Sequence, residues 1–464
     1  MGLRAKSTFG SRPIKIGVLT VVVALAGLAA AGVASGKPAQ ADKRQACTLA
    51  SSGTIKFFMS QDTKAAIGTE IGPAGVAAAN AWLEYTNSQG GVAGCKIEMG
   101  PVPDEAFGND ITTCLRNYRT AIASKKYSFI LGPTNSACMF QLGDVAAAAG
   151  MPLISGIAAD HQPFMEKFKP LNFHASVSTF LEGRGSAVAA RKLGWKSAAS
   201  FVPNYAYGQD AASAFEQEFK ALGGTITSHQ EAPFNESDFA KYINPIMATK
   251  PDGIFTAFFG PLIPPFWKYW IGSGNVGKAG LISGLTVLAT AQVVKAPSDI
   301  PANVYGYNRA DWQVLGKTKI GAALSKLYLA KYGKEHPLVS EFAFQIFSSL
   351  QMAKALIEKS NSLSGKDWQA VVEKGDFAFD SPYHQGPTYV NPVNHMADSC
   401  VIVGKNIWIP SLPKGFQASM DPKSFIKTCM NDVLNAKEAV AQTKNPGVSA
   451  AAIATYYKLS KSNN

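Results

Sequence analysis

The sequence predicts an α/β protein with two lobes, each a doubly wound parallel sheet, and three observations support this expectation. After Thr54, short β-rich runs alternate with Ala-rich amphipathic windows, and Gly or Pro marks most junctions. Strands that alternate with helices pair in parallel through right-handed crossovers, so that helices cover both faces of the sheet. A chain of 464 residues is too long for one hydrophobic core, and the alternation of strand-like runs and helical windows begins again after residues 172–176.

The first 41 residues have the composition of a secretory signal peptide. They contain five Lys or Arg residues and no acidic residue, and the uncharged stretch 16–36 is followed by Ala39-Gln40-Ala41, with small residues where a signal peptidase needs them. We expect cleavage after Ala41 and export to the periplasm. An uncleaved anchor helix is the alternative.

The net charge of +12 falls to about +7 once these five basic residues are set aside. The remaining Lys and Arg residues are spread along the chain rather than clustered, which is typical of a solvated basic surface. We therefore expect no nucleic-acid partner.

The alternating pattern places the elements of the two units in order. In the first unit we expect strands at 54–59, 96–102, 127–131 and 151–154, and helices near 71–88, 110–125 and 138–149. In the second unit we expect strands near 197–202, 224–228, 253–257 and 280–283, and helices near 178–193, 207–222, 236–249 and 262–273. Beyond them we expect helices in 316–373, short strands in 375–409, a helix over about 421–440 and a frayed tail, 441–464.

Several short motifs have an order and spacing that is specific as a set, although each is weak alone. They are Asn87-Ser88-Gln89-Gly90-Gly91-Val92-Ala93-Gly94, Ile130-Leu131-Gly132-Pro133, Gly150-Met151-Pro152-Leu153-Ile154-Ser155, Tyr207-Gly208, Asp238-Phe239 and Lys250-Pro251-Asp252. Through them nearly the whole chain after residue 41 resembles the branched-chain amino acid (Leu/Ile/Val) binding proteins of ABC transporters, which have the type I periplasmic-binding fold.

The resemblance implies a hinged clamp in which the chain crosses between the lobes three times, near 172–176, 304–308 and 382–390. Residues 42–174 plus 307–385 would form the first lobe, and residues 175–306 plus 386–440 the second. Closure on a small-molecule solute would be read by an ABC transporter permease in the inner membrane. We expect a monomer without a cofactor.

The resemblance also implies that two loops hold a solute carboxylate. Asn135 and Ser136 lie in the first loop, and Ser136 matches the carboxylate-binding serine of the family; a helix N-cap is its structural alternative. The second loop departs from the family because Ala159 replaces a hydroxyl residue, although the N–H groups of Ala158 and Ala159 could still serve. Tyr207 matches the tyrosine that covers the ligand from the second lobe, with a surface aromatic as the alternative.

The larger departure concerns the counter-charge for an amino group. Amino acid binders carry an acidic residue after the strand at 280–283, where this chain has Gly284-Leu285-Thr286-Val287, so Thr286 is the polar candidate there. An α-ammonium buried without a counter-charge would cost several kcal/mol. Ile67 stands where relatives often carry an aromatic, and Phe258 or Phe259 either enters the cleft or belongs to the core.

We therefore expect a solute with a carboxylate or amide head and an apolar or aromatic body. Asp160 or Glu182 could supply the missing carboxylate from elsewhere in the chain, so an amino acid is the second expectation. A solute-sensing receptor without transport is the third.

Six cysteines follow residue 41, an even number in an exported chain, and none has C-x-x-C spacing. Fifteen pairings are possible. The topology favours three of them, which are Cys47 with Cys95, Cys114 with Cys138, and Cys400 with Cys429.

Other motifs do not indicate metal binding or catalysis. The six histidines show no helical pairing and are expected at the surface, so no metal site is expected. The G-x-G-x-x-G run at 272–277 lies between a helix and a strand, the reverse of the dinucleotide context. No nucleophile motif is present, and we expect no enzyme activity.

Overall fold

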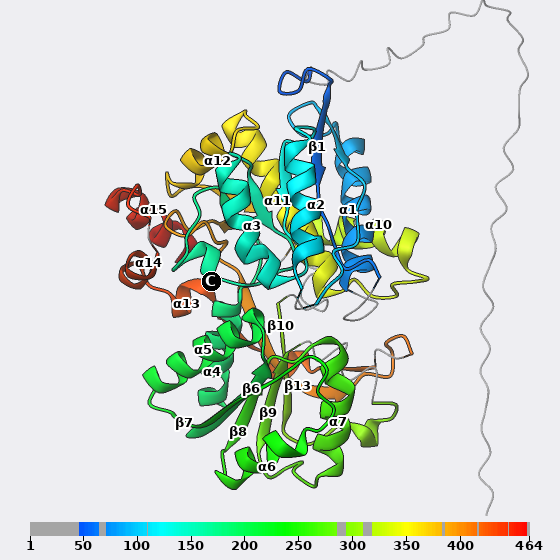
Figure 1. The fold of residues 1–464 in the computed structure, drawn as a ribbon, viewed down its shortest axis with the longest axis vertical. Helices are drawn as coiled ribbons and strands as arrows, with labels where there is room; N and C mark the ends of the chain where they lie inside the picture. The colour runs from blue at the N-terminus through cyan, green and yellow to red at the C-terminus, as the bar shows by residue number, and fades with distance from the viewer. Residues whose placement is uncertain are drawn as a thin grey trace, which may run out of the picture. The chain divides into compact units, whose positions relative to one another are not determined.

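The structure, a computed structural model, describes residues 46–64, 71–108, 110–284, 294–309, 318–382, 386–414, 417–443 and 445–461. The chain divides into Met1–Lys43 and a compact unit, Arg44–Asn464. The expected signal peptide, 1–41, lies outside the described residues. Within the compact unit, helices and strands form the two α/β lobes that the sequence predicts, each around its own sheet (Figure 1).

The first lobe is built on a sheet of five strands among the described residues, in the order β2-β1-β3-β4-β5, and all of its pairs are parallel. Its elements are β1 (Thr54–Phe58), α1 (Ile71–Ser88), β2 (Lys96–Met99), α2 (Thr112–Ala123), β3 (Phe129–Leu131), α3 (Ser136–Ala148), β4 (Leu153–Ser155), η1 (Gln162–Phe164) and β5 (Asn172–His174), joined later by α10 (Lys319–Tyr332), α11 (Glu341–Ser360) and α12 (Gly365–Val372). Parallel pairing needs crossovers, and the helices supply them.

The second lobe is built on a larger sheet, whose described strands follow the order β14-β13-β10-β9-β8-β6-β7 with β15 beside β13. Its elements are α4 (Thr179–Lys192), β6 (Ser197–Pro203), α5 (Ala206–Ala221), β7 (Thr225–Ala232), α6 (Ala240–Ala248), β8 (Gly253–Thr256), η2 (Gly260–Leu262), α7 (Ile263–Gly272), β9 (Gly280–Gly284), η3 (Pro297–Asp299), β10 (Val304–Asn308), β13 (Cys400–Trp408), β14 (Ala418–Met420) and β15 (Ile426–Cys429). The strands from β7 to β10 are parallel, whereas β13 joins β10 in the antiparallel direction.

The chain passes between the two sheets three times. It leaves the first sheet after β5 and enters α4, returns between β10 and α10, and passes again between β12 (Pro387–Tyr389) and β13. β12 itself pairs with β11 (Ala378–Asp380) in a two-stranded antiparallel ribbon. The two lobes are thus joined by separate chain segments rather than by one linker.

A close helix contact in the second lobe positions α5, which carries Tyr207 and has Tyr205 as its N-cap residue. A Cβ atom at Gly183 on α4 would come within 2.3 Å of the Ala211 carbonyl oxygen and 2.6 Å of the Phe215 nitrogen on α5. Only glycine allows this approach, because any side chain would overlap with the backbone of α5.

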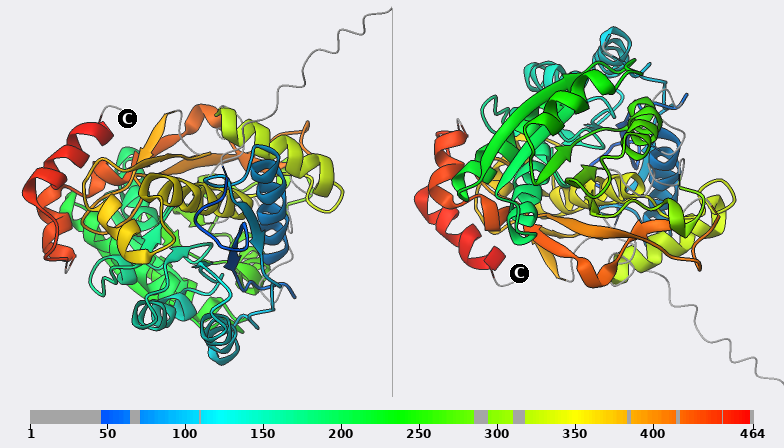
Figure 2. Two further views of the ribbon diagram at one scale, coloured as in Figure 1. Left: turned by 90° about the horizontal axis from the view of Figure 1, so that it is seen from above. Right: turned by 90° about the horizontal axis from the view of Figure 1, so that it is seen from below.

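The C-terminal part differs from the sequence prediction. The single helix expected over 421–440 is wrong, because residues 426–429 form β15, followed by two short helices, α13 (Met430–Val433) and α14 (Ala436–Gln442). The expected frayed tail is also wrong in part, because α15 (Ala450–Ser460) packs beside α14 at one flank of the unit (Figure 2). Tyr456 of α15 is fully buried and its hydroxyl donates to Asn431 Oδ1 at 3.0 Å.

The three disulfides are the ones that the topology favours. Cys47–Cys95 joins the segments that precede β1 and β2, Cys114–Cys138 joins α2 to α3, and Cys400–Cys429 joins β13 to β15. Among the described residues, no helix is both long and apolar enough to cross a membrane.

Candidate functional site

A cavity lies between the two lobes of the compact unit. It is lined by Ile71, Phe107, Thr134, Ser136, Ile157, Ala159, Tyr205, Tyr207, Phe259, Arg309 and Phe342.

Most of these residues follow the carboxyl end of a strand. Thr134 and Ser136 follow β3, Ala159 follows β4, Tyr205 follows β6, and Arg309 follows β10 directly. In α/β sheets the loops at the carboxyl ends of parallel strands gather at one edge, and ligands bind there. The cavity therefore lies where the topology of both sheets predicts a ligand site.

The first residues of α3 bring a helix N-terminus to the cavity. Asn135 is the N-cap, with its side chain accepting from the Cys138 N–H at 3.1 Å and donating to the Gly108 carbonyl at 2.8 Å. The N-cap role therefore belongs to Asn135, and Ser136 lines the cavity instead. The Ser136 N–H donates to the Tyr205 hydroxyl, which comes from the opposite lobe, at 2.5 Å.

The loop after β4 supplies mainly apolar surface. Ile157 and Ala159 line the cavity, while the N–H of Ala158 is already donated to the Pro133 carbonyl at 3.0 Å. The Ala159 carbonyl accepts from the Thr179 N–H at 2.8 Å, which links this loop to the start of α4. In this form of the protein the Ala158 N–H is not available to a solute.

Arg309 places a buried positive charge in the cavity wall. The residue is 5% exposed and its guanidinium pairs with Glu182, which is fully buried. Its Nη1 also donates to the Ile157 carbonyl at 3.0 Å, and its backbone N–H donates to Glu341 Oε2 at 3.0 Å. Burial disfavours the charged guanidinium, but Glu182, Tyr207 and Glu341 together outweigh this effect and raise the pKa of Arg309, which stays charged.

Aromatic rings from both lobes form much of the remaining wall. Phe107 of the first lobe lies with its ring centroid 6.1 Å from that of Tyr205 and 6.0 Å from that of Phe259. Tyr207 and Phe259 meet edge to face at 5.4 Å, and the Arg309 guanidinium carbon lies 5.3 Å from the centre of the Tyr207 ring. Such a wall is suited to a flat apolar body beside a cation.

The nine residues predicted from the sequence separate into four groups. Ser136, Ala159, Tyr207 and Phe259 line the cavity, whereas Asn135 and Ala158 stand next to lining residues. Phe258 packs in the core of the second lobe, with its ring centroid 4.8 Å from that of Phe201. Ile67 and Thr286 lie outside the described residues. Contact of any of the nine with a solute stays a prediction.

The sequence analysis missed Arg309, Tyr205 and Phe107. A signal existed for Tyr205, because it follows the strand expected at 197–202 and ligands bind at the carboxyl ends of strands. Arg309 follows residues 304–308, which the sequence analysis expected as a crossing between the lobes and which the structure shows to be β10. Phe107 lies in an irregular segment after β2, where no sequence signal marks it.

The model of the family described as periplasmic binding protein matches residues 54–406. The chain belongs to this family and is a solute-binding protein of the type that serves ABC transporters, rather than an enzyme. The resemblance inferred from the motifs is thereby confirmed.

Solved structures with the same fold come from several bacteria. A solute-binding protein of an ABC transporter from Rhodopseudomonas palustris HaA2, in complex with p-hydroxybenzoic acid, is 20% identical with a TM-score of 0.67, over 81% of this chain and 98% of that one. One from Rhodopseudomonas palustris BisB5, in complex with 3,4-dihydroxybenzoic acid, is 18% identical with a TM-score of 0.65, over 85% and 99%. The LivJ protein of Streptococcus pneumoniae, in complex with isoleucine, is 18% identical with a TM-score of 0.64, over 81% and 100%. No curated protein matches the sequence.

Proposed function

We propose that this chain is the periplasmic component of an ABC importer and closes on a small carboxylic acid with an aromatic body. The observation that carries the proposal is Arg309, a buried cation in the wall of a cavity that is otherwise lined mainly by aromatic and aliphatic side chains. A buried cation is costly unless an anion compensates it. Glu182 supplies one, and a solute carboxylate would supply a second.

The polar end of the cavity suits a carboxylate. A guanidinium can bind a carboxylate through two parallel N–H donors, and the positive end of a helix dipole adds to the attraction. The Ser136 hydroxyl, at the N-terminus of α3, lines the same cavity as Arg309. We propose that these two groups hold the solute head.

The apolar end suits a ring. Phe107, Tyr205, Tyr207 and Phe259 already meet one another at centroid distances of 5.4–6.1 Å. An edge-to-face aromatic pair contributes about 0.5–1.5 kcal/mol beyond its buried area. Two of the similar solved structures hold hydroxylated benzoic acids, in agreement with this choice of solute.

An amino acid is the second candidate, and one observation favours it. Glu182 Oε2 is buried and has no hydrogen-bond partner among the described residues, although its other oxygen pairs with Arg309. A pair of Arg309 for the carboxylate and Glu182 for the ammonium would suit a zwitterion. The LivJ protein, which has the same fold, holds isoleucine.

Transport requires opening and closing, and we propose that the three chain crossings form the hinge. The lobes would be 42–174 plus 307–385 and 175–306 plus 386–440, with export directed by the cleavable leader 1–41. The contact between Ser136 and Tyr205 joins the two lobes and can form only when they are closed. A permease would read this closed form, with the chain acting as a monomer.

Isothermal titration calorimetry on protein that has been unfolded and refolded to remove co-purified solute tests the proposal. We expect saturable one-to-one binding of benzoate, 4-hydroxybenzoate or 3,4-dihydroxybenzoate. Methyl benzoate, which lacks the charge, should not bind. Binding of leucine or isoleucine without response to any benzoate would replace the proposal with the amino acid candidate. Solute uptake by vesicles that contain the cognate permease separates transport from sensing.

A further inference from the structure

Three ionisable side chains that do not line the cavity meet beside it. Asp160, His161 and Asp210 are 0%, 7% and 7% exposed, and one ligand atom from each lies within 4.8 Å of the others. Asp160 directly follows Ala159, which lines the cavity. The sequence analysis expected surface histidines, and the burial of His161 contradicts it.

Two elements from different lobes bring these residues together. Asp160 and His161 lie between β4 of the first sheet and η1, whereas Asp210 is on α5, which follows β6 of the second sheet. Gln162 fixes both carboxylates, since its N–H donates to Asp160 Oδ1 at 3.0 Å and its Nε2 donates to Asp210 Oδ1 at 2.8 Å. One oxygen of each carboxylate is thereby held in place.

The second oxygen of each carboxylate is not satisfied. Asp160 Oδ2 and Asp210 Oδ2 are buried without a hydrogen-bond partner among the described residues. His161 Nδ1 lies 3.8 Å from Asp210 Oδ2, too far for a hydrogen bond, and is instead 2.7 Å from the Thr179 hydroxyl. Two buried oxygens of this kind point to a group that is missing between them.

The charges support the same conclusion. Asp160 and Asp210 would bury two negative charges side by side, and Glu166 adds a third at 3.7 Å from His161 Nε2.

We propose that Asp160, His161 and Asp210 bind a divalent transition-metal ion of the Zn²⁺ type. Two ligand atoms at about 2.1 Å from a tetrahedral ion lie about 3.4 Å apart. The 3.8 Å between His161 Nδ1 and Asp210 Oδ2 is close to this distance, and the ligand atoms of the three residues, which lie within 4.8 Å of one another, would move closer together on binding. Mixed imidazole and carboxylate donors suit Zn²⁺ better than Ca²⁺ or Mg²⁺, which prefer oxygen ligands alone.

The surroundings complete the metal site. Glu166 lies by His161 Nε2, where a carboxylate typically orients a ligating imidazole through its other nitrogen. The Thr179 hydroxyl, 2.7 Å from His161 Nδ1, could serve as a fourth ligand or hold a bound water. Helical His spacing could not have revealed this site, because Asp210 lies far from Asp160 in the sequence.

Such an ion would join the lobes, because Asp160 and His161 come from one and Asp210 from the other. It would therefore stabilise the closed form whatever solute the cavity holds. The proposal does not depend on the identity of that solute.

Metal titration of the full chain tests the site. Protein stripped with a chelator is titrated with ZnCl₂ by calorimetry, and bound metal is counted by mass spectrometry after gel filtration. We expect one Zn²⁺ per chain, a higher melting temperature with Zn²⁺, and little response to Ca²⁺ or Mg²⁺. Asp210→Asn keeps the oxygen that Gln162 contacts but should weaken Zn²⁺ binding by about 100-fold or more, since loss of even an outer-shell partner costs 10–100-fold.

The matched control is His229→Gln. His229 has carboxylates at 2.7 Å and 3.2 Å but lies on the surface of the second lobe, so this variant should bind Zn²⁺ as the unaltered chain does. Asp160→Asn removes a second ligand and should weaken Zn²⁺ binding in the same way. Circular dichroism on both variants shows whether either has failed to fold. Absence of one-to-one binding, or binding that survives Asp210→Asn and is lost in His229→Gln, overturns the proposal. An Asp160→Asn variant that is more stable without any metal effect would show a shared proton instead, and would also overturn it.

Discussion

The Tyr205 hydroxyl accepts a hydrogen bond from the Ser136 N–H across the two lobes, with 2.5 Å between oxygen and nitrogen. Ser136 begins α3 of the first lobe, and Tyr205 is the N-cap of α5 in the second. The Tyr205 hydroxyl thus takes up an N–H donor at the N-terminus of a helix, a position that attracts anions. A solute that used this donor would have to displace Tyr205.

Replacement of Tyr205 by Phe should favour the open form. The variant loses one hydrogen bond between the lobes, which contributes about 0.5–1.5 kcal/mol. We expect a larger radius of gyration in solution scattering of the solute-free protein. Tyr269→Phe is the control, because the Tyr269 hydroxyl bonds Asn244 within the second lobe. Equal radii for the two variants would contradict the prediction.

Arg309→Gln should abolish binding of aromatic acids and also destabilise the protein. Its removal leaves Glu182 buried without a counter-charge, a change that typically costs about 3–5 kcal/mol in the free energy of unfolding. Adding Glu182→Gln should restore most of the stability measured in urea, yet not the binding. Benzoate binding by the stable double variant would show that Arg309 is not the anchor.

Asp398→Asn should stabilise the protein at neutral and alkaline pH. Burial raises the pKa of Asp398 from its ordinary value of 3.8 to about 7. A raised carboxyl pKa means that the folded state binds the proton more tightly, so stability is lost as pH rises from about 4 to 7. The neutral amide avoids this loss and can still accept from the Asn431 N–H.

We therefore expect the Asp398→Asn substitution to add roughly 1–3 kcal/mol to the free energy of unfolding at pH 8, within the limit of about 1.4 kcal/mol per pKa unit. At pH 4 the two proteins should be equally stable in urea. An equal difference at both pH values would contradict the role of charge.

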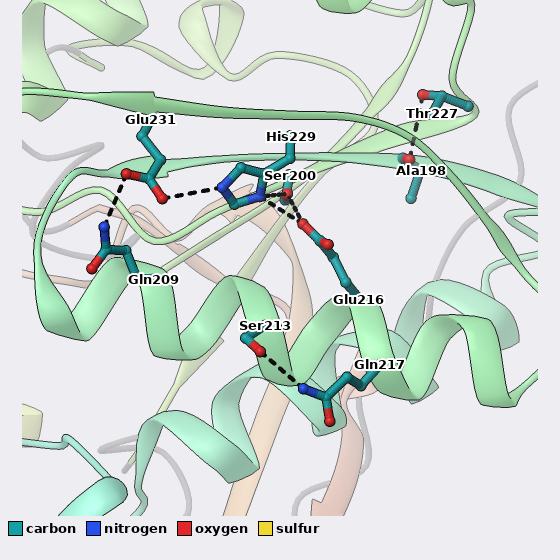
Figure 3. A network of polar contacts seen from close by, with 9 residues as sticks. All are labelled: Ala198, Ser200, Gln209, Ser213, Glu216, Gln217, Thr227, His229 and Glu231. Carbon is teal, nitrogen blue, oxygen red and sulfur yellow. Dashed lines mark hydrogen bonds and ion pairs between the residues drawn. The ribbon is translucent and has the colours of Figure 1, made fainter.

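His229 should make part of the stability depend on alkaline pH. Its ring nitrogens face Glu216 at 2.7 Å and Glu231 at 3.2 Å (Figure 3). The hydrogen bond to Glu216 is the main reason that the pKa of His229 is raised from 6.5 to about 9. A raised histidine pKa gives stability that is complete below about pH 6.5 and is lost as pH rises through 9.

The expected size is small, about 0.5–1 kcal/mol, because the His229 side chain is 40% exposed and solvent screens its ion pairs. Melting temperatures of the chain and of His229→Gln should differ at pH 6 and converge at pH 10. A constant difference would indicate packing rather than charge.

The Cys114–Cys138 disulfide should support both stability and binding. It joins α2 to the first turn of α3, which also carries Ser136, and it closes a loop with a sequence separation of 24. Loops of this length contribute roughly 3 kcal/mol by restricting the unfolded chain. Cys114→Ser with Cys138→Ser should lower urea stability by this order and weaken benzoate binding, whereas loss of Cys400–Cys429 should affect stability alone.

Local patterns predicted the regular part of the fold because each element carries its own periodicity. The helix expected at 71–88 has the bounds of α1, and the strand at 54–59 differs from β1 by one residue. The helix expected at 421–440 failed because residues 426–429 form a strand only by pairing with residues 400–403. That pairing is not visible in a local window.

The site could be predicted only where the chain topology decides it. Ser136 and Ala159 follow strands and line the cavity, as expected because ligands of α/β proteins bind at the carboxyl ends of the strands. Phe258 and Phe259 show the limit of the sequence, because adjacent residues face opposite ways and the pattern does not tell which enters the cavity. The pairing of Arg309 with Glu182 joins residues that are remote in sequence, so it needed the fold.

The position of the cavity between the lobes makes solute size a condition for closure. Phe107 and Ser136 line it from one lobe and Tyr207 and Phe259 from the other, so the bulk of a bound solute sets how closely the lobes can approach. A larger acid could still reach Arg309 in the open form, yet it would keep the lobes apart. The permease would then receive a size-graded selection of acids, because a solute that prevents closure also prevents its own delivery.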